Sequence, residues 1–111
     1  MSWRSDGIRS WLIQRISAIF IFLFLIYLSL FFLQSEHLDY ATWSAWVSLK
    51  ANKVIILLFF ISLLLHAWVG IRDVVLDYVH AFTIRFIVLT TIIGALLSLA
   101  VWLLLIIIKV Q

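Results

Sequence analysis

The chain has 111 residues, of which 67% are hydrophobic and only 12% are charged, and it contains neither cysteine nor proline. Soluble domains carry about a quarter charged residues and a chain this short buries only a modest share of its surface, so the composition indicates an integral membrane protein. The absence of cysteine excludes disulfides, iron–sulfur clusters held by this chain and thiol chemistry. The net charge of +3 comes from basic residues scattered beside apolar segments, which we interpret as topology signals and not as a nucleic-acid-binding surface.

Three apolar segments reach the length of about 20 residues that spans a bilayer. They run from about residue 12 to 33, from 54 to 71 and from 84 to 108, and we expect the second to continue as helix past the lipid boundary to about residue 78. The first is longer than the roughly 7–15-residue core of a signal peptide and lacks a small-x-small cleavage pattern, so we expect it to be retained. Backbone groups in lipid must be satisfied internally. The sequence therefore predicts an all-α membrane protein with three transmembrane helices, in one domain over residues 1–111.

The first connection, residues 34–53, holds Trp43, Trp46 and Val47 at positions i, i+3 and i+4. This spacing places the three side chains on one face of a helix, and tryptophan is enriched at the membrane–water interface. We therefore predict a short amphipathic helix lying on the membrane. Asp39 is a suitable N-cap residue for its start.

Basic residues near the ends of the membrane segments predict the orientation, because cytoplasmic loops carry an excess of lysine and arginine. Five arginines flank the amino terminus and the second connection: Arg4, Arg9, Arg15, Arg72 and Arg85. Three lysines flank the opposite side: Lys50, Lys53 and Lys109. We expect the amino terminus and the second connection to face the cytoplasm.

Polar residues of the second segment form one narrow stripe. Ser62, His66, Gly70, Asp73 and Asp77 follow each other at spacings of four, four, three and four residues, which places them on one helical face. Ionisable groups inside a bilayer cost several kcal/mol and almost always face protein or a cavity. This face therefore meets a partner helix, a cofactor or both.

His66 is the most informative member of the stripe, since it lies well inside the apolar segment. It is either a histidine hydrogen-bonded to a neighbouring helix or an axial ligand of haem iron through a neutral imidazole nitrogen. Gly70, one turn away on the same face, leaves room for a flat porphyrin, although glycine also serves helix packing. His37 and His80 lie outside the apolar segments. An electron-carrying haem would therefore take its second axial ligand from another subunit.

Asp77 and Tyr78 lie about 16–18 Å along the helix from His66, at 1.5 Å per residue, near the membrane interface. Tyr78 is either an interfacial anchor or a phenol that donates a hydrogen bond to a quinone carbonyl. Asp77, with Asp73, is either part of a solvated helix end paired with Arg72 or Arg85, or a carboxylate that orients a cationic neighbour. The spacing leaves these alternatives open.

Arg15 offers a similar choice at the start of the first segment. It is either a snorkelling topology charge, whose stem follows apolar surface while its head stays in water, or a counter-ion for a buried anion such as a haem propionate. In the third segment, Thr90, Gly94 and Ser98 lie four residues apart. Such a stripe of small residues lets helices approach closely, and we interpret it as a packing face.

The run His66–Gly70 (HAWVG), followed by Asp77–Val79 (DYV), resembles the second helix of the small haem-binding membrane anchor of succinate dehydrogenase. The run Arg15–Ile19 (RISAI) resembles the start of the first helix in that family. The three-helix plan and the long first connection are similar as well, so the resemblance covers nearly the whole chain. Arg72 and Asp73 depart from the family pattern, in which these positions are often uncharged.

The resemblance implies that His66 ligates a b-type haem, with the other histidine supplied by a second hydrophobic anchor, the larger cytochrome b component of such complexes. It implies that Tyr78 hydrogen-bonds ubiquinone near the iron–sulfur subunit and that Asp77 supports an arginine of the partner anchor. Arg15 would lie near the haem propionates. Electrons from succinate would arrive through a flavoprotein subunit and the iron–sulfur subunit.

The predicted function is therefore that of a membrane-anchor subunit of a respiratory succinate:ubiquinone oxidoreductase in the bacterial inner membrane, with no catalytic activity when alone. Two alternatives remain. One is the anchor of a quinol:fumarate reductase, which runs the chemistry in reverse. The other is a non-redox helical scaffold, in which the polar stripe serves only hydrogen bonds between helices.

Overall fold

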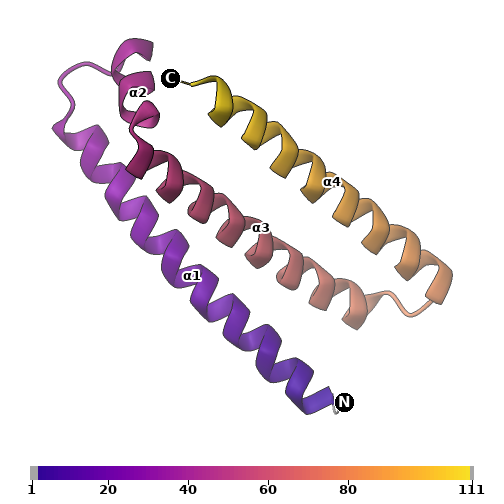
Figure 1. The fold of residues 1–111 in the computed structure, drawn as a ribbon. Coiled ribbons are helices and arrows are strands. Elements are labelled where there is room, and N and C mark those ends of the chain that lie inside the picture. The colour runs from indigo at the N-terminus through magenta and orange to yellow at the C-terminus, as the bar shows by residue number, and fades with distance from the viewer. Residues whose placement is uncertain (1–2, 111) are drawn as a thin grey trace.

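Three long helices lie side by side, and a short fourth helix lies at one end of the bundle (Figure 1). The computed structural model describes residues 3–110, so Met1, Ser2 and Gln111 of the predicted domain lie outside it. The helices are α1 (Trp3–Gln34), α2 (Tyr40–Ser48), α3 (Lys50–Tyr78) and α4 (Phe82–Lys109). The three long helices are apolar enough to cross a membrane. The predicted all-α fold with three membrane spans is confirmed.

The central helix is α3, which packs against α1 on one side and α4 on the other (Figure 1). One end of the bundle holds the start of α1 and the connection of residues 79–81 between α3 and α4; we call it the N-terminal end. The opposite end, here called the α2 end, holds α2 and the end of α4. α3 therefore has a neighbouring helix on either side, and α1 is the one that its polar stripe contacts.

Two helices begin earlier than hydropathy alone predicts. α1 begins at Trp3 and not near residue 12, and α3 begins at Lys50 and not near residue 54. No proline interrupts either extension, and both carry polar side chains that are satisfied inside the protein. Ser10 in the extension of α1 accepts a hydrogen bond from Arg72, and Asn52 in the extension of α3 is only 3% exposed. Polar residues lower the hydropathy, so a hydropathy criterion excludes them from a membrane helix. Their contacts with other helices allow them to remain part of it.

The face of α1 that is turned inward follows a regular repeat. Seven positions between Gly7 and Gln34 are not exposed, and they are spaced alternately by four and three residues: Ser10, Gln14, Ser17, Ile21, Phe24, Leu28 and Phe31. Such a repeat keeps one side of a helix against its neighbour along its whole length. We call this contact the α1–α3 seam. Its first three positions are polar and its last four are apolar.

The α2 end is held by aromatic stacking and by a buried amide. Trp46 stacks on Phe31 with ring centroids 4.8 Å apart, and Trp43 stacks on Phe32 at 6.0 Å. Asn52 accepts a hydrogen bond from the Tyr27 hydroxyl at 2.6 Å and donates one to the carbonyl oxygen of Trp46 at 2.8 Å. These contacts fasten α2 to both α1 and α3, and both predicted tryptophans stack on rings of α1.

The start of α2 has the predicted cap. The Asp39 carboxylate accepts a hydrogen bond from the backbone N–H of Thr42 at 2.8 Å, which satisfies one of the free donors at the helix start. Hydrogen bonds from Thr42 hold the pKa of the Asp39 carboxyl below its usual value. The carboxylate therefore stays charged where it caps.

The outer surface of α4 is exposed along the stripe of small residues. Thr90, Gly94 and Ser98 are all exposed, and a Cβ added at Gly94 would meet no atom within 4 Å among the described residues. The Ser98 hydroxyl donates to the Gly94 carbonyl of its own helix at 2.8 Å. The stripe is thus not used for packing between the helices of residues 3–110.

Candidate functional site

The polar half of the α1–α3 seam surrounds His66. The Nδ1 atom of His66 lies 3.0 Å from the Ser17 hydroxyl oxygen, and the Gln14 side-chain amide donates to the His66 backbone carbonyl at 3.0 Å. Ser17 is 4% exposed, and its hydroxyl donates to the Gln14 backbone carbonyl at 3.1 Å. One turn of α1 therefore contacts the histidine at both its ring and its backbone.

Gly70 permits this close contact. A Cβ added at Gly70 would lie 3.2 Å from Nε2 of Gln14, which is tighter than ordinary van der Waals contact. The nearest neighbour of Gly70 in this chain is thus the Gln14 amide. The sequence-based interpretation of Gly70 as space for a porphyrin misses this contact, because nothing in the second segment indicates how near α1 comes.

Arg72 joins the two helices at the N-terminal end. Its Nη2 atom donates to the Ser10 hydroxyl at 2.5 Å and lies 3.3 Å from Oδ1 of Asp73. Its Nε atom is buried and has no hydrogen-bond partner among the described residues. The charge pair that departs from the expected family pattern therefore acts across the seam and not only along α3.

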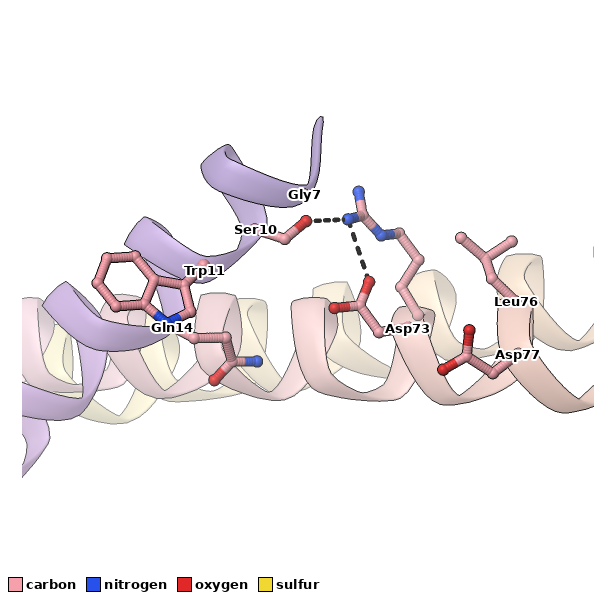
Figure 2. A pocket seen from close by; sticks show the side chains of 8 residues that line it. Gly7, Ser10, Trp11, Gln14, Asp73, Leu76 and Asp77 are labelled. Carbon is pink, nitrogen blue, oxygen red and sulfur yellow. Dashed lines mark hydrogen bonds and ion pairs between the residues drawn. The ribbon is translucent and has the colours of Figure 1, made fainter. Parts of the chain in front are cut away.

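A cavity of about 610 Å³ opens between the first turns of α1 and the end of α3. Asp73 and Asp77 rise from the same side of α3 toward α1, while Ser10, Trp11 and Gln14 approach from α1 (Figure 2). Among the described side chains that line it, the two carboxylates share this space with the guanidinium of Arg72. The cavity thus combines a largely apolar lining with charged groups of both signs.

Tyr78 lies apart from this cavity. It is the last residue of α3 and is 78% exposed, whereas the preceding Asp77 lines the cavity. Arg85 donates to the backbone carbonyls of Val79 and Leu76 at 3.0 and 3.3 Å and so satisfies the end of α3. Of the two predicted partners for the carboxylates, Arg72 pairs with Asp73, and Arg85 bonds to backbone.

Arg15 also lies off the seam. Its side chain is exposed, and its guanidinium carbon lies 5.5 Å from the centroid of the Trp11 ring one turn earlier, within the range of a cation–π contact. The structure therefore brings His66, Gly70, Asp73 and Asp77 together against α1. It leaves Arg15 and Tyr78 on the surface of the chain.

Three residues of this site were not identified from the sequence as belonging to it: Ser10, Gln14 and Ser17. Their spacing of four and three residues is a helical stripe of the same kind as the one on α3, and it could have been recognised as its complement. The sequence alone does not single out this stripe of α1, because serine and glutamine near a basic amino-terminal segment also suit a solvated helix end.

The surroundings of the His66 ring fit a metal ligand in one respect. Histidines that bind metals almost always engage their second ring nitrogen in a hydrogen bond that fixes the ring, and here Nδ1 is engaged by Ser17. The ring is half-buried inside a helix that can cross a membrane. Its Nε2 atom is the nitrogen through which an iron ion would be bound.

Three long apolar helices, with hydrogen bonds between polar side chains of α1 and α3, define a multi-pass membrane protein. The family model described as "Succinate dehydrogenase/Fumarate reductase transmembrane subunit" matches residues 1–108, and the chain belongs to this family. A relative with a similar sequence is the succinate dehydrogenase hydrophobic membrane anchor subunit of Coxiella burnetii (strain RSA 493 / Nine Mile phase I). It is 31% identical over 96 residues, which cover 86% of this chain and 84% of the relative.

Proposed function

We propose that this chain is the hydrophobic anchor subunit of a succinate:ubiquinone oxidoreductase, that it co-ligates haem b through His66, and that Tyr78 and Asp77 complete the ubiquinone site. Membership of the family supports the role of a membrane subunit. The observation that carries the haem assignment is the hydrogen bond of 3.0 Å between Ser17 and Nδ1 of His66, deep in an apolar helix. The chain then helps to pass electrons from succinate oxidation to the quinone pool.

The bound haem would supply a one-electron redox centre. His66 would hold the iron from α3, and a second protein ligand would come from a histidine of the second hydrophobic anchor, because His37 and His80 lie outside the membrane spans of this chain. Arg15 is free of the seam and exposed, so its guanidinium is available to the haem propionates. Displacing it from Trp11 breaks only a surface cation–π contact, worth about 0.5–1 kcal/mol.

The quinone site would lie at the N-terminal end of the bundle, against the iron–sulfur subunit. Tyr78 is exposed at the end of α3, where its phenol is free to donate a hydrogen bond to a quinone carbonyl. Asp77 lines the cavity between α1 and α3, where its carboxylate suits a cationic side chain of the partner anchor. This end faces the cytoplasm of a bacterium in the orientation that the arginine distribution predicts.

Catalysis would belong to the assembled complex. Iron–sulfur clusters are held by cysteine thiolates, and this chain has no cysteine, so the clusters and the flavin would reside in the soluble iron–sulfur and flavoprotein subunits. The anchor's contribution is to hold those subunits on the inner membrane and to deliver electrons to a lipid-soluble acceptor.

Substitution of His66 tests the haem assignment. In the purified complex, His66→Ala should abolish the absorption bands of reduced haem b, since one axial ligand is lost. The matched control is His37→Ala, which removes an exposed histidine between α1 and α2 and should leave the bands unchanged. Full retention of the bands in His66→Ala would contradict the assignment and would favour a scaffold, in which the same hydrogen bond only joins two helices.

The anchor of a quinol:fumarate reductase is the second candidate, because the matching family includes the transmembrane subunits of both enzymes. The two functions use the same sites in opposite directions. Comparing the rate of succinate oxidation by ubiquinone with that of fumarate reduction by a low-potential quinol, in the same membranes, separates them.

A further inference from the structure

We propose that Ser17 is a positioning residue that holds His66 in the tautomer with its proton on Nδ1, so that Nε2 presents an unprotonated lone pair to a metal. This inference rests on the proposed haem-binding function. It concerns a residue on α1 that does not touch the iron and acts only through the imidazole of α3.

The neighbours of the Ser17 hydroxyl favour one tautomer. A serine hydroxyl has one proton to donate and two lone pairs to accept with. When the Ser17 proton is donated to the Gln14 carbonyl oxygen, which lies 3.1 Å away, the hydroxyl oxygen is left to accept a hydrogen bond from Nδ1 of His66 at 3.0 Å. A neutral imidazole that donates from Nδ1 carries its free lone pair on Nε2. The opposite tautomer would place a proton on Nε2 and block coordination.

A contact with the backbone of His66 helps to keep its ring next to the Ser17 hydroxyl. Ser17 is 4% exposed, so water has little access to compete for its oxygen. The Gln14 amide donates to the His66 carbonyl at 3.0 Å, and Gly70 allows that amide to approach. The same turn of α1 therefore fixes the backbone of His66 and the orientation of its ring.

This arrangement predicts an effect on the electronic properties of the ligand. Donation of a hydrogen bond from Nδ1–H raises the basicity of the other ring nitrogen, and a more basic ligand favours ferric over ferrous iron. Removing the acceptor should therefore weaken haem retention, by about 10-fold or more in affinity as for other outer-shell partners. It should also move the reduction potential of the remaining haem to a more positive value.

The test compares Ser17→Thr with Ser17→Val in the purified complex. The two side chains have nearly the same shape and the same branching at Cβ, so their effects on the helix are similar, but only threonine keeps the hydroxyl. Haem per complex and the haem midpoint potential are measured for both. We expect Ser17→Thr to match the native protein, and Ser17→Val to lose haem and to show the more positive potential. Equal haem content and equal potential in the two variants would overturn the inference.

A double-mutant cycle separates positioning from packing. In a His66→Ala background the hydroxyl has no imidazole to orient, so Ser17→Thr and Ser17→Val should assemble into the complex to the same extent. If Ser17→Val still assembles less than Ser17→Thr in the His66→Ala background, the hydroxyl acts through the Gln14 carbonyl alone and the inference is wrong.

The proposed function has its own contrary outcome. If His66→Ala itself retains haem, the proposed function fails, and the positioning role fails with it.

Discussion

The two halves of the α1–α3 seam follow the same repeat but are built for different purposes. The apolar half is packed: Phe24 stacks on Phe59 with ring centroids 4.2 Å apart and belongs to a buried cluster with Val47, Ile56 and Ile107. A cavity of about 240 Å³ lies beside these two rings, whereas the polar half holds hydrogen bonds beside a larger cavity of about 610 Å³. Lipid is as apolar as these side chains, so close packing must hold the helices together. Because the apolar half holds the helices together, the polar half can position side chains such as His66 and Ser17.

Removing an aromatic ring from the apolar half should have the largest effect on stability. Phe24→Ala leaves a cavity in the seam, which we expect to cost about 3 kcal/mol, at the lower end of the range for such substitutions because lipid supplies no hydrophobic term. The loss would appear as earlier unfolding in an SDS titration in mixed micelles. Phe22→Ala, on the exposed side of α1 (62% exposed), is the control. Equal losses for the two variants would show that the seam does not hold the helices.

Changing a residue beyond the polar half should alter activity without altering stability. Tyr78→Phe removes one hydrogen bond to the quinone, worth about 1 kcal/mol, so succinate-dependent ubiquinone reduction should fall by roughly 5-fold. Reduction of an artificial dye by the flavoprotein should be unchanged. Tyr40→Phe, a tyrosine of equal exposure (78%) at the α2 end, serves as the control. A parallel loss with both acceptors would indicate defective assembly and contradict the quinone role.

The smallest expected effect tests how tightly the polar half is fitted. Gly70→Ala gains up to about 1 kcal/mol in helix propensity but pushes the Gln14 amide from the His66 carbonyl, since its Cβ would lie 3.2 Å from Nε2. We expect a nearly neutral change in the native chain and a stabilisation of about 0.5–1 kcal/mol in a Gln14→Ala chain, measured by the same SDS titration. Identical changes in both backgrounds would show that Gln14 does not restrict this position.

The sequence predicted the helices and one face of the site, but not the partner face. Length and hydropathy are sufficient to identify three spans, and the spacing from Ser62 to Asp77 is sufficient to predict an inward stripe on α3. The pairing of Ser17 with His66 depends on the register of two helices. If α1 slid along α3 by one turn, about 5.4 Å, both helices would keep their polar stripes, but each side chain would meet a different partner.

The roles of Arg15 and Tyr78 do not follow from the register of the helices. Arg15 and Tyr78 are both exposed in this chain, and the contacts that would give them a role belong to other subunits and cofactors. Asp73 differs from these two residues, because its partner Arg72 belongs to the same chain. The ion pair between them is therefore visible in this structure. The resemblance to the family provided expectations for Arg15 and Tyr78 that no spacing within 111 residues can supply.

The brevity of the connection at residues 79–81 has a consequence for biogenesis. α3 and α4 are separated by three residues, so we expect them to enter the bilayer as a helical hairpin, whereas α1 is synthesised first and is joined to them through the longer segment that contains α2. Until the hairpin docks, the side chains of Ser10, Gln14 and Ser17 lack the partners that α3 provides. The surroundings of His66 are therefore completed late, when the two insertion units meet, and an incorrectly docked hairpin would expose these polar groups to membrane quality control.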